Sequence, residues 1–288
     1  MKAYIKQNPV KLFFVLTFII SWSGILIVTS QTGIPATPTQ FDRLLPIAMI
    51  PYLLGPVVAS FLLLGIIKGK IGFKELFKKL TNWRLDAKFY LIATLTIPIL
   101  SGLSLLILYQ FSDVYIPDIF SAENKVTLIV SGLIYGIIGG GILEELGWSG
   151  FAVPNLKERY SVLKTGFFVG LLWGAWHFLP VIWGCGDNYG NLVLGKFLPG
   201  FFFHYAGLIP TRIIMVWLYD RANSLIPPMI MHATLTAFTF FIFNISQEGT
   251  ALFNYYLLIA IGLWITVAFV LYDWNMKQIY SNKNKHCH

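Results

Sequence analysis

Charged residues and cysteines are scarce in this sequence of 288 residues. Only 12% of the residues are charged, about half of the roughly 25% that soluble globular proteins carry. Such a chain cannot cover a water-exposed surface, and with 56% hydrophobic residues it is too apolar to be disordered. Two cysteines, Cys185 and Cys287, are too few for a disulfide framework or a cysteine metal cluster. With a mean hydropathy of +0.69, the sequence predicts a polytopic membrane protein.

Long apolar runs are, by contrast, abundant. A membrane-spanning helix requires about 20 mostly apolar residues, and eight runs approach that length. The predicted spans are residues 10–28, 44–67, 89–109, 126–145, 167–183, 201–218, 225–243 and 251–272. The first run is interpreted as a span because no small-residue cleavage site follows it. The sequence therefore predicts an all-α bundle of about eight transmembrane helices.

The connectors between these runs alternate in charge. Basic residues cluster before the first span, between the second and third, after the fourth and after the eighth. The clusters are Lys2, Lys6 and Lys11; Lys68, Lys70, Lys74, Lys78, Lys79, Arg84 and Lys88; Lys157, Arg159 and Lys164; and Lys277, Lys283 and Lys285. The positive-inside rule then predicts that both termini are cytoplasmic, which agrees with an even number of spans. The net charge of +8 is thus interpreted as a membrane-orientation signal, with lipids rather than nucleic acid as partner.

The basic loop 70–88 has apolar residues on one side of a predicted helix. Phe73, Phe77 and Leu80 recur at helical spacing. This pattern allows the loop to lie on anionic lipid headgroups, although a loop that only sets the topology is the favoured interpretation.

Ionisable side chains within apolar runs are candidate functional residues, because placing a charge in the hydrocarbon region costs about 2.5–3.5 kcal/mol. The candidates are Glu144, Glu145, His177, His204, Arg212 and His232. Glycines four residues apart precede Glu144 and permit close approach of a neighbouring helix. Glu144 continues that glycine face and is predicted to point into the bundle. Glu145 is rotated by about 100° and shares its side of the helix with Ser149.

Two further helices carry polar pairs at i and i+4. Trp173 lies on one face with His177, and His232 with Thr236. A carboxylate and two imidazoles at compatible depths can deprotonate a water and stabilise an oxyanion. His204 is expected to make only an interhelical hydrogen bond, since no partner is predicted at its depth.

Two common hydrolase patterns fit poorly. The His-Glu-x-x-His pattern of zinc proteases is absent from the sequence. Gly147-Trp-Ser149-Gly150 has the form seen in rhomboid-type serine proteases, with His177 or His232 as the base. This match is short, lies at a helix end and leaves the adjacent glutamates unexplained.

Three segments carry a more specific pattern. They read Glu144-Glu145-Leu-Gly-Trp-Ser149-Gly-Phe-Ala-Val-Pro, Trp173-Gly-Ala-Trp-His177-Phe-Leu-Pro and His232-Ala-Thr-Leu-Thr236. Over residues 126–243 the chain resembles the CPBP family, the CAAX protease and bacteriocin-processing group also called Abi, which includes the type II CAAX prenyl endopeptidases. The resemblance implies an intramembrane endopeptidase whose conical cavity opens to the cytoplasmic leaflet.

The resemblance also implies roles for the site residues. Glu144 would activate water with help from His177, and His232 with Thr236 would stabilise the oxyanion; Trp173 would be a supporting residue. The substrate would be a membrane-associated or lipidated peptide. No cofactor is then required, but a mechanism in which Glu144, His177 and His232 bind a divalent metal such as zinc stays open.

The implied organisation has three parts. Residues 1–125 hold three spans and the cytoplasmic basic loop, residues 126–245 form the catalytic core, and residues 246–288 hold the last span and a cytoplasmic tail. The apolar, lysine- and asparagine-rich composition favours a bacterial plasma membrane as the location.

The sequence departs from the family pattern at two positions. Ser149 stands where the arginine of Glu-Glu-x-x-x-Arg belongs, and Thr236 replaces the usual asparagine with a single hydroxyl. Arg212 is hypothesised to supply the missing counter-charge to Glu145 from another helix; the alternative is that it snorkels to the interface.

These departures favour a slow enzyme and leave a second hypothesis open. It is a catalytically impaired membrane scaffold or a bacteriocin self-immunity protein. A small-solute transporter is a third, although the inverted repeats expected of one are not visible.

Overall fold

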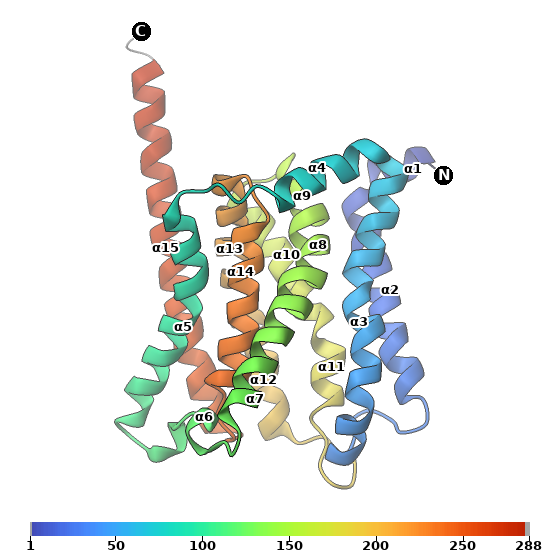
Figure 1. The fold of residues 1–288 in the computed structure, drawn as a ribbon, viewed down its shortest axis with the longest axis vertical. Helices are drawn as coiled ribbons and strands as arrows, with labels where there is room; N and C mark the ends of the chain where they lie inside the picture. The colour runs from blue at the N-terminus through green and yellow to red at the C-terminus, as the bar shows by residue number, and fades with distance from the viewer. Residues whose placement is uncertain (1, 286–288) are drawn as a thin grey trace.

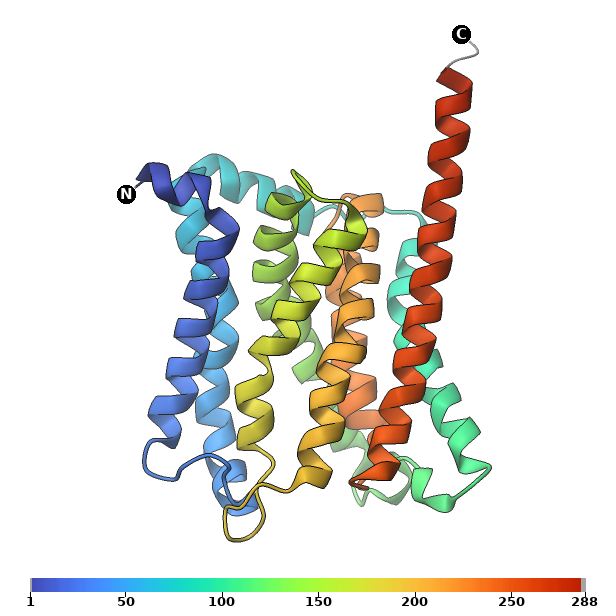
Figure 2. The same ribbon diagram turned by 180° about the vertical axis from the view of Figure 1, so that it is seen from behind.

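The computed structural model describes the backbone of residues 2–285 and the side chains of residues 3–272. These residues form an all-α bundle of long helices, as predicted (Figure 1 and, from behind, Figure 2). In the described part, seven helices are long and apolar enough to cross a membrane. The remaining predicted span, 225–243, is a shorter apolar helix, Ile226–Ile242. The polytopic fold class is confirmed.

The first half of the chain supplies three spans and several short helices. They are α1 (Lys2–Gln7), α2 (Pro9–Thr29), α3 (Pro38–Ile67), α4 (Lys70–Leu80), α5 (Ala87–Tyr109), the 3₁₀ turn η1 (Asp113–Tyr115) and α6 (Asp118–Ser121). The span α3 begins earlier than predicted because Thr37 and Gln40 form a capping box, in which each side chain bonds the other's backbone N–H. The long α3 therefore reaches from one end of the bundle to the other.

The second half supplies the remaining spans, all but the last of which are divided into consecutive segments. The fourth span comprises α7 (Lys125–Ile134), η2 (Tyr135–Glu144), α8 (Glu145–Gly147), η3 (Trp148–Ala152) and α9 (Val153–Lys157). The others are α10 (Val162–Trp176) with α11 (Phe178–Trp183), α12 (Leu194–Ala206) with α13 (Leu208–Ala222), α14 (Ile226–Thr234) with η4 (Leu235–Ile242), and α15 (Thr250–Lys285). The segments η2, η3 and η4 are π-helical.

The two ends of the bundle differ in charge. One end carries α1, α4 and α9 (Figure 1) and is called the basic end below. At the opposite end lie the connectors 30–37, 110–124, 184–193 and 243–249 (Figures 1 and 2). The alternation predicted from the sequence is therefore reproduced in space for the described residues. The basic residues predicted to follow the last span, Lys277, Lys283 and Lys285, lie outside the described side chains.

The helix α4 lies across the basic end (Figure 1). Its Leu76 is buried against the bundle, whereas Phe77 is 65% exposed. The predicted helix in the basic loop is thus present, with Leu76 directed inward and Phe77 exposed at the surface.

The most buried span is formed by α12 and α13, with 78% of its apolar window buried. It begins at Leu194, earlier than the predicted 201, and continues to Ala222 with a break at Gly207. Because other helices surround this span, polar side chains on it point into the bundle rather than into lipid. His204 and Arg212 both lie on it.

The glycines of the fourth span allow the close approach that their spacing predicts. A Cβ on Gly136 would lie 2.4 Å from the carbonyl oxygen of Ala233, and one on Gly140 would lie 2.6 Å from Cδ2 of His232. Contacts this short are incompatible with any side chain. The fourth span therefore packs directly on α14, which brings Glu144 next to His232.

Candidate active site

Glu144 ends the segment η2, and only 4% of it is exposed. Its Oε2 accepts hydrogen bonds from the indole N–H groups of Trp148 at 3.1 Å and Trp173 at 2.8 Å. Its Oε1 lies 3.8 Å from Nε2 of His232, which is beyond hydrogen-bond distance. The two indoles thus fix one oxygen and leave the other directed towards His232.

Glu145 is fully buried and is the centre of a separate network. Its Oε2 accepts hydrogen bonds from Nη1 of Arg212 at 2.7 Å and from Oγ of Ser149. Its Oε1 lies 2.7 Å from Nδ1 of His232. The adjacent carboxylates therefore have different partners, as the rotation between them predicts.

Arg212 lies where the counter-charge hypothesis requires a cation. The residue is completely buried, so the alternative that it snorkels to the interface is wrong. Its Cζ lies 4.1 Å from the centroid of the Trp173 ring, an attractive cation–π arrangement. Trp173 thereby touches both networks, because its N–H group bonds Glu144 while its face covers Arg212.

His232 bridges the two carboxylates. Because a carboxylate only accepts hydrogen bonds, the contact with Glu145 assigns a proton to Nδ1 of His232 and turns Nε2 towards Glu144. Gly140 lies against both His232 and Thr236: a Cβ there would approach Nε2 of the histidine to 2.8 Å and Oγ1 of the threonine to 2.9 Å. The histidine and the threonine are thus neighbours, as their i, i+4 spacing predicts.

His177 lies at the junction of α10 and α11, and its Nδ1 is 2.8 Å from the carbonyl oxygen of Trp173. Its ring centroid lies 4.8 Å from that of His204. The expectation that His204 has no partner at its depth is therefore wrong. The interhelical hydrogen bond expected of it is also absent from the described contacts, because Nδ1 of His204 lies 2.5 Å from the carbonyl oxygen of Gly200 on the same helix. Among the described side chains, no hydrogen bond joins His177 to Glu144.

These groups border one cavity of about 300 Å³. The polar side chains at its wall are Glu144, His177, His204, His232 and Thr236. Aromatic and aliphatic side chains supply most of the remaining wall. The arrangement therefore combines one carboxylate, three imidazoles and a hydroxyl in an otherwise apolar space, which suits polar chemistry on a substrate held by apolar contacts.

The cavity extends from Glu144 towards the end of the bundle opposite the basic end. Its lining residue Tyr135 precedes Glu144 on the fourth span, and Phe241 follows His232 on η4. The leaflet to which the resemblance assigns the opening stays a prediction.

Ser149 does not have the position of a nucleophile. Its hydroxyl is fully buried, donates to Glu145 and does not line the cavity. The rhomboid-type interpretation is therefore unsupported by the geometry.

The arrangement does not favour the metal-dependent alternative. Within the described part of the chain, no three His, Cys, Asp or Glu side chains are grouped closely enough to hold a metal ion.

Two contacts of the site were not predicted from the sequence. The Trp148 bond to Glu144 is an i, i+4 pair, so its spacing was an available signal. The ring of Tyr52 stacks on Trp176 with centroids 3.8 Å apart, and its hydroxyl donates to the carbonyl oxygen of Trp176 at 3.4 Å. This contact joins residues 124 positions apart, and no local pattern indicates it.

Fold and site together define an all-α membrane protein with a buried glutamate–histidine centre. Residues 125–238 match the family model described as type II CAAX prenyl endopeptidase Rce1-like. The chain is also similar to a protein named CAAX prenyl protease 2 from Methanococcus maripaludis, with 26% identity over 279 residues, which cover 94% of this chain and 96% of the relative. Both similarities support the resemblance to the CAAX protease, or CPBP, family.

Arg212→Ala is expected to destabilise the protein strongly. It leaves the Glu145 carboxylate buried without its cation, which typically costs about 3–5 kcal/mol. Thermal unfolding in detergent measures the loss. Lys68→Ala is the matched control, because Lys68 pairs with Glu75 at the surface, where such pairs contribute about 0–1 kcal/mol.

A second substitution tests the partner directly. Ser149→Arg in the Arg212→Ala background restores a cation four residues from Glu145, and part of the lost thermal stability should return. Equal stability of Arg212→Ala and the natural protein, or no recovery in the double variant, would contradict the counter-charge assignment.

Proposed function

We propose that this protein is an intramembrane endopeptidase that hydrolyses a peptide bond of a membrane-associated or lipidated peptide. The observation that carries the proposal is the Glu144 carboxylate, held by two indole N–H groups beside His232 at the wall of a cavity. Similarity to a protein named as a protease supports it.

In the proposed reaction Glu144 is the general base. Water in the cavity gives a proton to Oε1 of Glu144 while its oxygen bonds the scissile carbonyl carbon. When the C–N bond of the tetrahedral intermediate breaks, that proton passes to the leaving amine, with His177 as the relay at the cavity wall. The products are a new carboxyl terminus and a new amino terminus, and no covalent enzyme intermediate forms.

His232 and Thr236 would stabilise the negative oxygen of the intermediate. Glu145 holds the proton on Nδ1, so Nε2 donates to an oxyanion when the ring is protonated. Arg212 in turn balances the charge of Glu145. Through this chain of contacts Arg212, Glu145 and Ser149 position His232 without touching the substrate.

We further propose a bacterial plasma membrane as the location, with the basic end and both termini in the cytoplasm. The charge difference between the two ends supports this orientation. Lipids and a peptide substrate are the proposed partners, and neither nucleic acid nor a resident cofactor is required by the proposed reaction.

The second candidate function is a non-catalytic scaffold or a bacteriocin self-immunity protein. The features that favour this candidate are Ser149 and Thr236, the two departures from the family pattern. The contact of Arg212 with both Glu145 and Ser149 weakens this candidate, because the charge lost at position 149 is supplied from α13. Thr236 still borders the cavity with a hydroxyl.

Glu144→Gln is expected to abolish cleavage without unfolding the protein. The carboxamide retains an oxygen for the two indole donors but cannot take a proton from water, and removing a general base typically costs 10²–10⁴-fold in rate, an order-of-magnitude figure. Purified protein in detergent, incubated with a library of lipidated peptides, measures cleavage; His177→Ala should also lower it.

The control for this change is Glu248→Gln, which alters a carboxylate at the opposite end. Its activity should equal that of the natural protein. Cleavage that persists in both Glu144→Gln and His177→Ala would favour the scaffold and assign the hydrolysis to a contaminant. A chelator added to the same assay tests the metal-dependent alternative.

Thr236→Val is expected to lower kcat by about 10²–10³-fold, the usual effect of losing one oxyanion donor, with little change in KM. Thr236→Asn supplies the amide of the family pattern and should keep kcat at or above the natural level. Steady-state kinetics on one cleaved peptide measures both. Equal kcat in the valine variant and the natural protein would remove Thr236 from the oxyanion site.

A further inference from the structure

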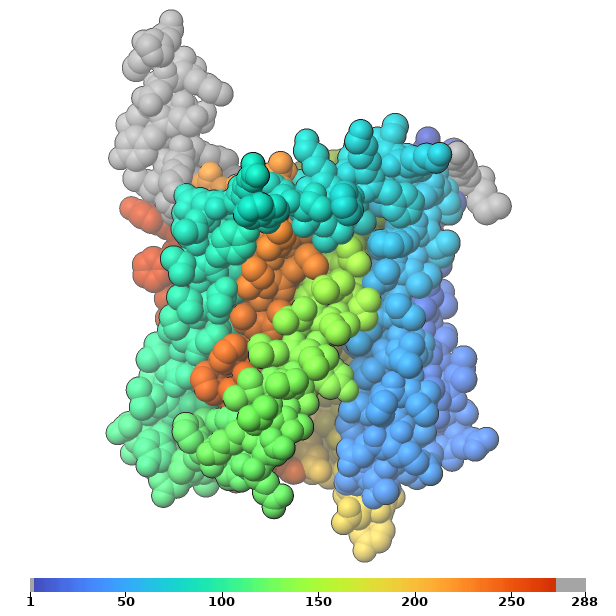
Figure 3. Space-filling model, viewed as in Figure 1, coloured from blue at the N-terminus to red at the C-terminus, as the bar shows by residue number. Residues whose placement is uncertain are grey.

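The helix α4 lies at one border of the apolar surface of the bundle. Exposed apolar side chains on α3 continue as far as Leu62 and Ile66. The charged Lys68 follows, and α4 begins at Lys70. Figure 3 shows the atoms of α4 as a rim above the exposed side of α3. Because α3 is long and apolar enough to span a membrane, the hydrocarbon layer ends where the apolar surface of this helix ends, and α4 lies at that edge.

One flank of α4 is apolar and adjoins that surface. Phe73 and Phe77 are four residues apart, which places them on the same face of the helix, and both are exposed. The ring of Phe73 lies edge-on to the ring of Phe61 on α3, with centroids 5.6 Å apart. Phe61 is itself exposed and precedes the end of α3 by six residues, which is about 9 Å along a helix. Phe73 and Phe77, called the phenylalanine flank below, therefore continue the apolar side of α3.

The neighbouring flank of α4 is basic. Lys70, Lys74 and Lys78 recur at intervals of four residues, which places them on one face of the helix, about 60° from the phenylalanine flank. All three are exposed, and among the described side chains they have no ion-pair or hydrogen-bond partner. These residues, called the lysine row below, thus present three positive charges to an external partner.

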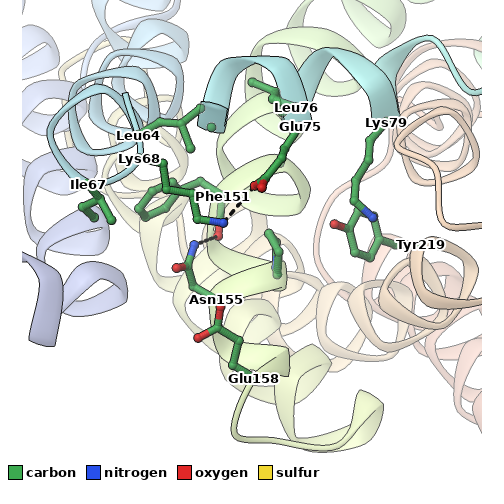
Figure 4. Close-up of a pocket in the computed structure, with 13 residues that line it drawn as sticks. Leu64, Ile67, Lys68, Glu75, Leu76, Lys79, Phe151, Asn155, Glu158 and Tyr219 are labelled. Atoms are coloured by element: carbon green, nitrogen blue, oxygen red, sulfur yellow. Dashed lines mark hydrogen bonds and ion pairs between the residues drawn. The ribbon is translucent and has the colours of Figure 1, made fainter. Parts of the chain in front are cut away.

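Other basic residues of this segment are already engaged. Lys68 pairs with Glu75 at 2.9 Å, and Nζ of Lys79 lies 4.6 Å from the ring centroid of Tyr219 (Figure 4). Glu75 also lines the small pocket beneath α4, together with Glu158, and two carboxylates make that pocket unsuitable for an anion. The lysine row on the outside of α4 is therefore the part of this segment that is suited to bind anions.

Contacts with the bundle hold α4 in this orientation. The buried Leu76 packs on the backbone of Gly150 in the fourth span, and its Cδ1 lies 2.9 Å from the place of a Cβ there. At the end of α4, the carbonyl oxygen of Lys79 accepts a hydrogen bond from the backbone N–H of Leu225 at 3.1 Å. The helix is thus fixed to the fourth span and to the connector before α14. A ligand of the lysine row would therefore not have to order the helix, which lowers the cost of binding.

We propose that α4 is an interfacial helix that binds anionic phospholipid headgroups through the lysine row and inserts the phenylalanine flank among the acyl chains. Interfacial helices carry basic residues on the polar face and large apolar residues on the other. Residues 68–88 include seven basic side chains and two acidic ones, a charge complementary to anionic lipid. The exposed Trp83, which follows α4, suits the same boundary. This binding requires neither the peptidase activity nor a particular side of the membrane for the basic end.

Energy transfer to labelled lipids measures the lipid composition next to α4. In a chain with Cys185→Ser and Cys287→Ser, a donor dye is attached to Thr81→Cys at the end of α4. The control position is Phe111→Cys, on an exposed connector at the opposite end. Each protein is reconstituted in phosphatidylcholine vesicles with a small fraction of phosphatidylglycerol or, in parallel, phosphatidylcholine that carries an acceptor on an acyl chain.

Transfer from Thr81→Cys should be greater to phosphatidylglycerol than to phosphatidylcholine, and transfer from Phe111→Cys should show no such preference. One lysine near an anionic surface gives about a fivefold preference. The joint replacement Lys70→Gln, Lys74→Gln and Lys78→Gln should therefore abolish the preference, whereas joint replacement by arginine should keep it. High salt should weaken the preference in the chain with its natural lysines, because it screens exposed charges.

A matched control removes the same charge from other elements of the basic end. The joint replacement Lys6→Gln, Lys11→Gln and Lys164→Gln should keep most of the preference at Thr81→Cys. Equal transfer to the two lipids, a preference that salt does not change, or equal loss in this control and in the lysine-row variant would overturn the proposal. If the lipids are not distinguished and the lysine row instead binds a soluble polyglutamate peptide, its partner is an acidic protein and the proposal is wrong.

Thermal unfolding in detergent tests the same binding without vesicles. A lipid that binds only the folded protein raises Tm, so added phosphatidylglycerol should raise it more than phosphatidylcholine does. The lysine-row variant should lose this excess. Phe77→Ser should lose part of it, whereas Phe111→Ser, which alters an exposed phenylalanine at the opposite end, should not. Equal shifts with the two lipids, an excess that survives in the lysine-row variant, or equal effects of the two serine variants would contradict the proposal.

Discussion

The buried ion pair between Arg212 and Glu145 is the interaction on which the rest of the site depends. Both side chains are completely removed from solvent, and a buried charge without a partner is strongly destabilising. The pair joins the fourth span to α13, in the most buried span, and fixes the carboxylate that contacts Nδ1 of His232. The same guanidinium lies on the face of Trp173, whose N–H group fixes Glu144. One ion pair thus orients both the proposed base and the proposed oxyanion donor.

Packing explains how these charges are brought together inside a membrane bundle. The glycines of the fourth span remove the side chains that would separate η2 from α14, so the backbone of Gly136 touches that of Ala233. The adjacent carboxylates then face two environments: one bonds indoles at a cavity wall, the other a cation in the fully packed interior. This division gives Glu144 access to water and keeps Glu145 from it, although the two are neighbours in the chain.

The sequence predicted the helical class, the spans to within a few residues at most ends, and the residues that gather around the cavity. It could do so because a membrane span is recognisable by its apolar composition, and the three motifs are recognisable by the spacing of their residues. It misjudged His204, since the contact of its ring with His177 joins two helices and no local pattern indicates it. It gave no signal for the π-helical segments, because a uniformly apolar run looks the same at either helical period. The packing of Trp148 against Phe13 and Phe14 of α2 is likewise a long-range contact that no local pattern encodes.

The most direct test of the account is a structure of the protein with an apolar peptide in which a hydroxyethylene group replaces the scissile bond. The account predicts that the peptide lies in the cavity, with its hydroxyl within about 2.6–3.2 Å of the Glu144 carboxylate and beside His232 and Thr236. A peptide bound outside this cavity, or a hydroxyl placed against Ser149 instead of Glu144, would contradict it.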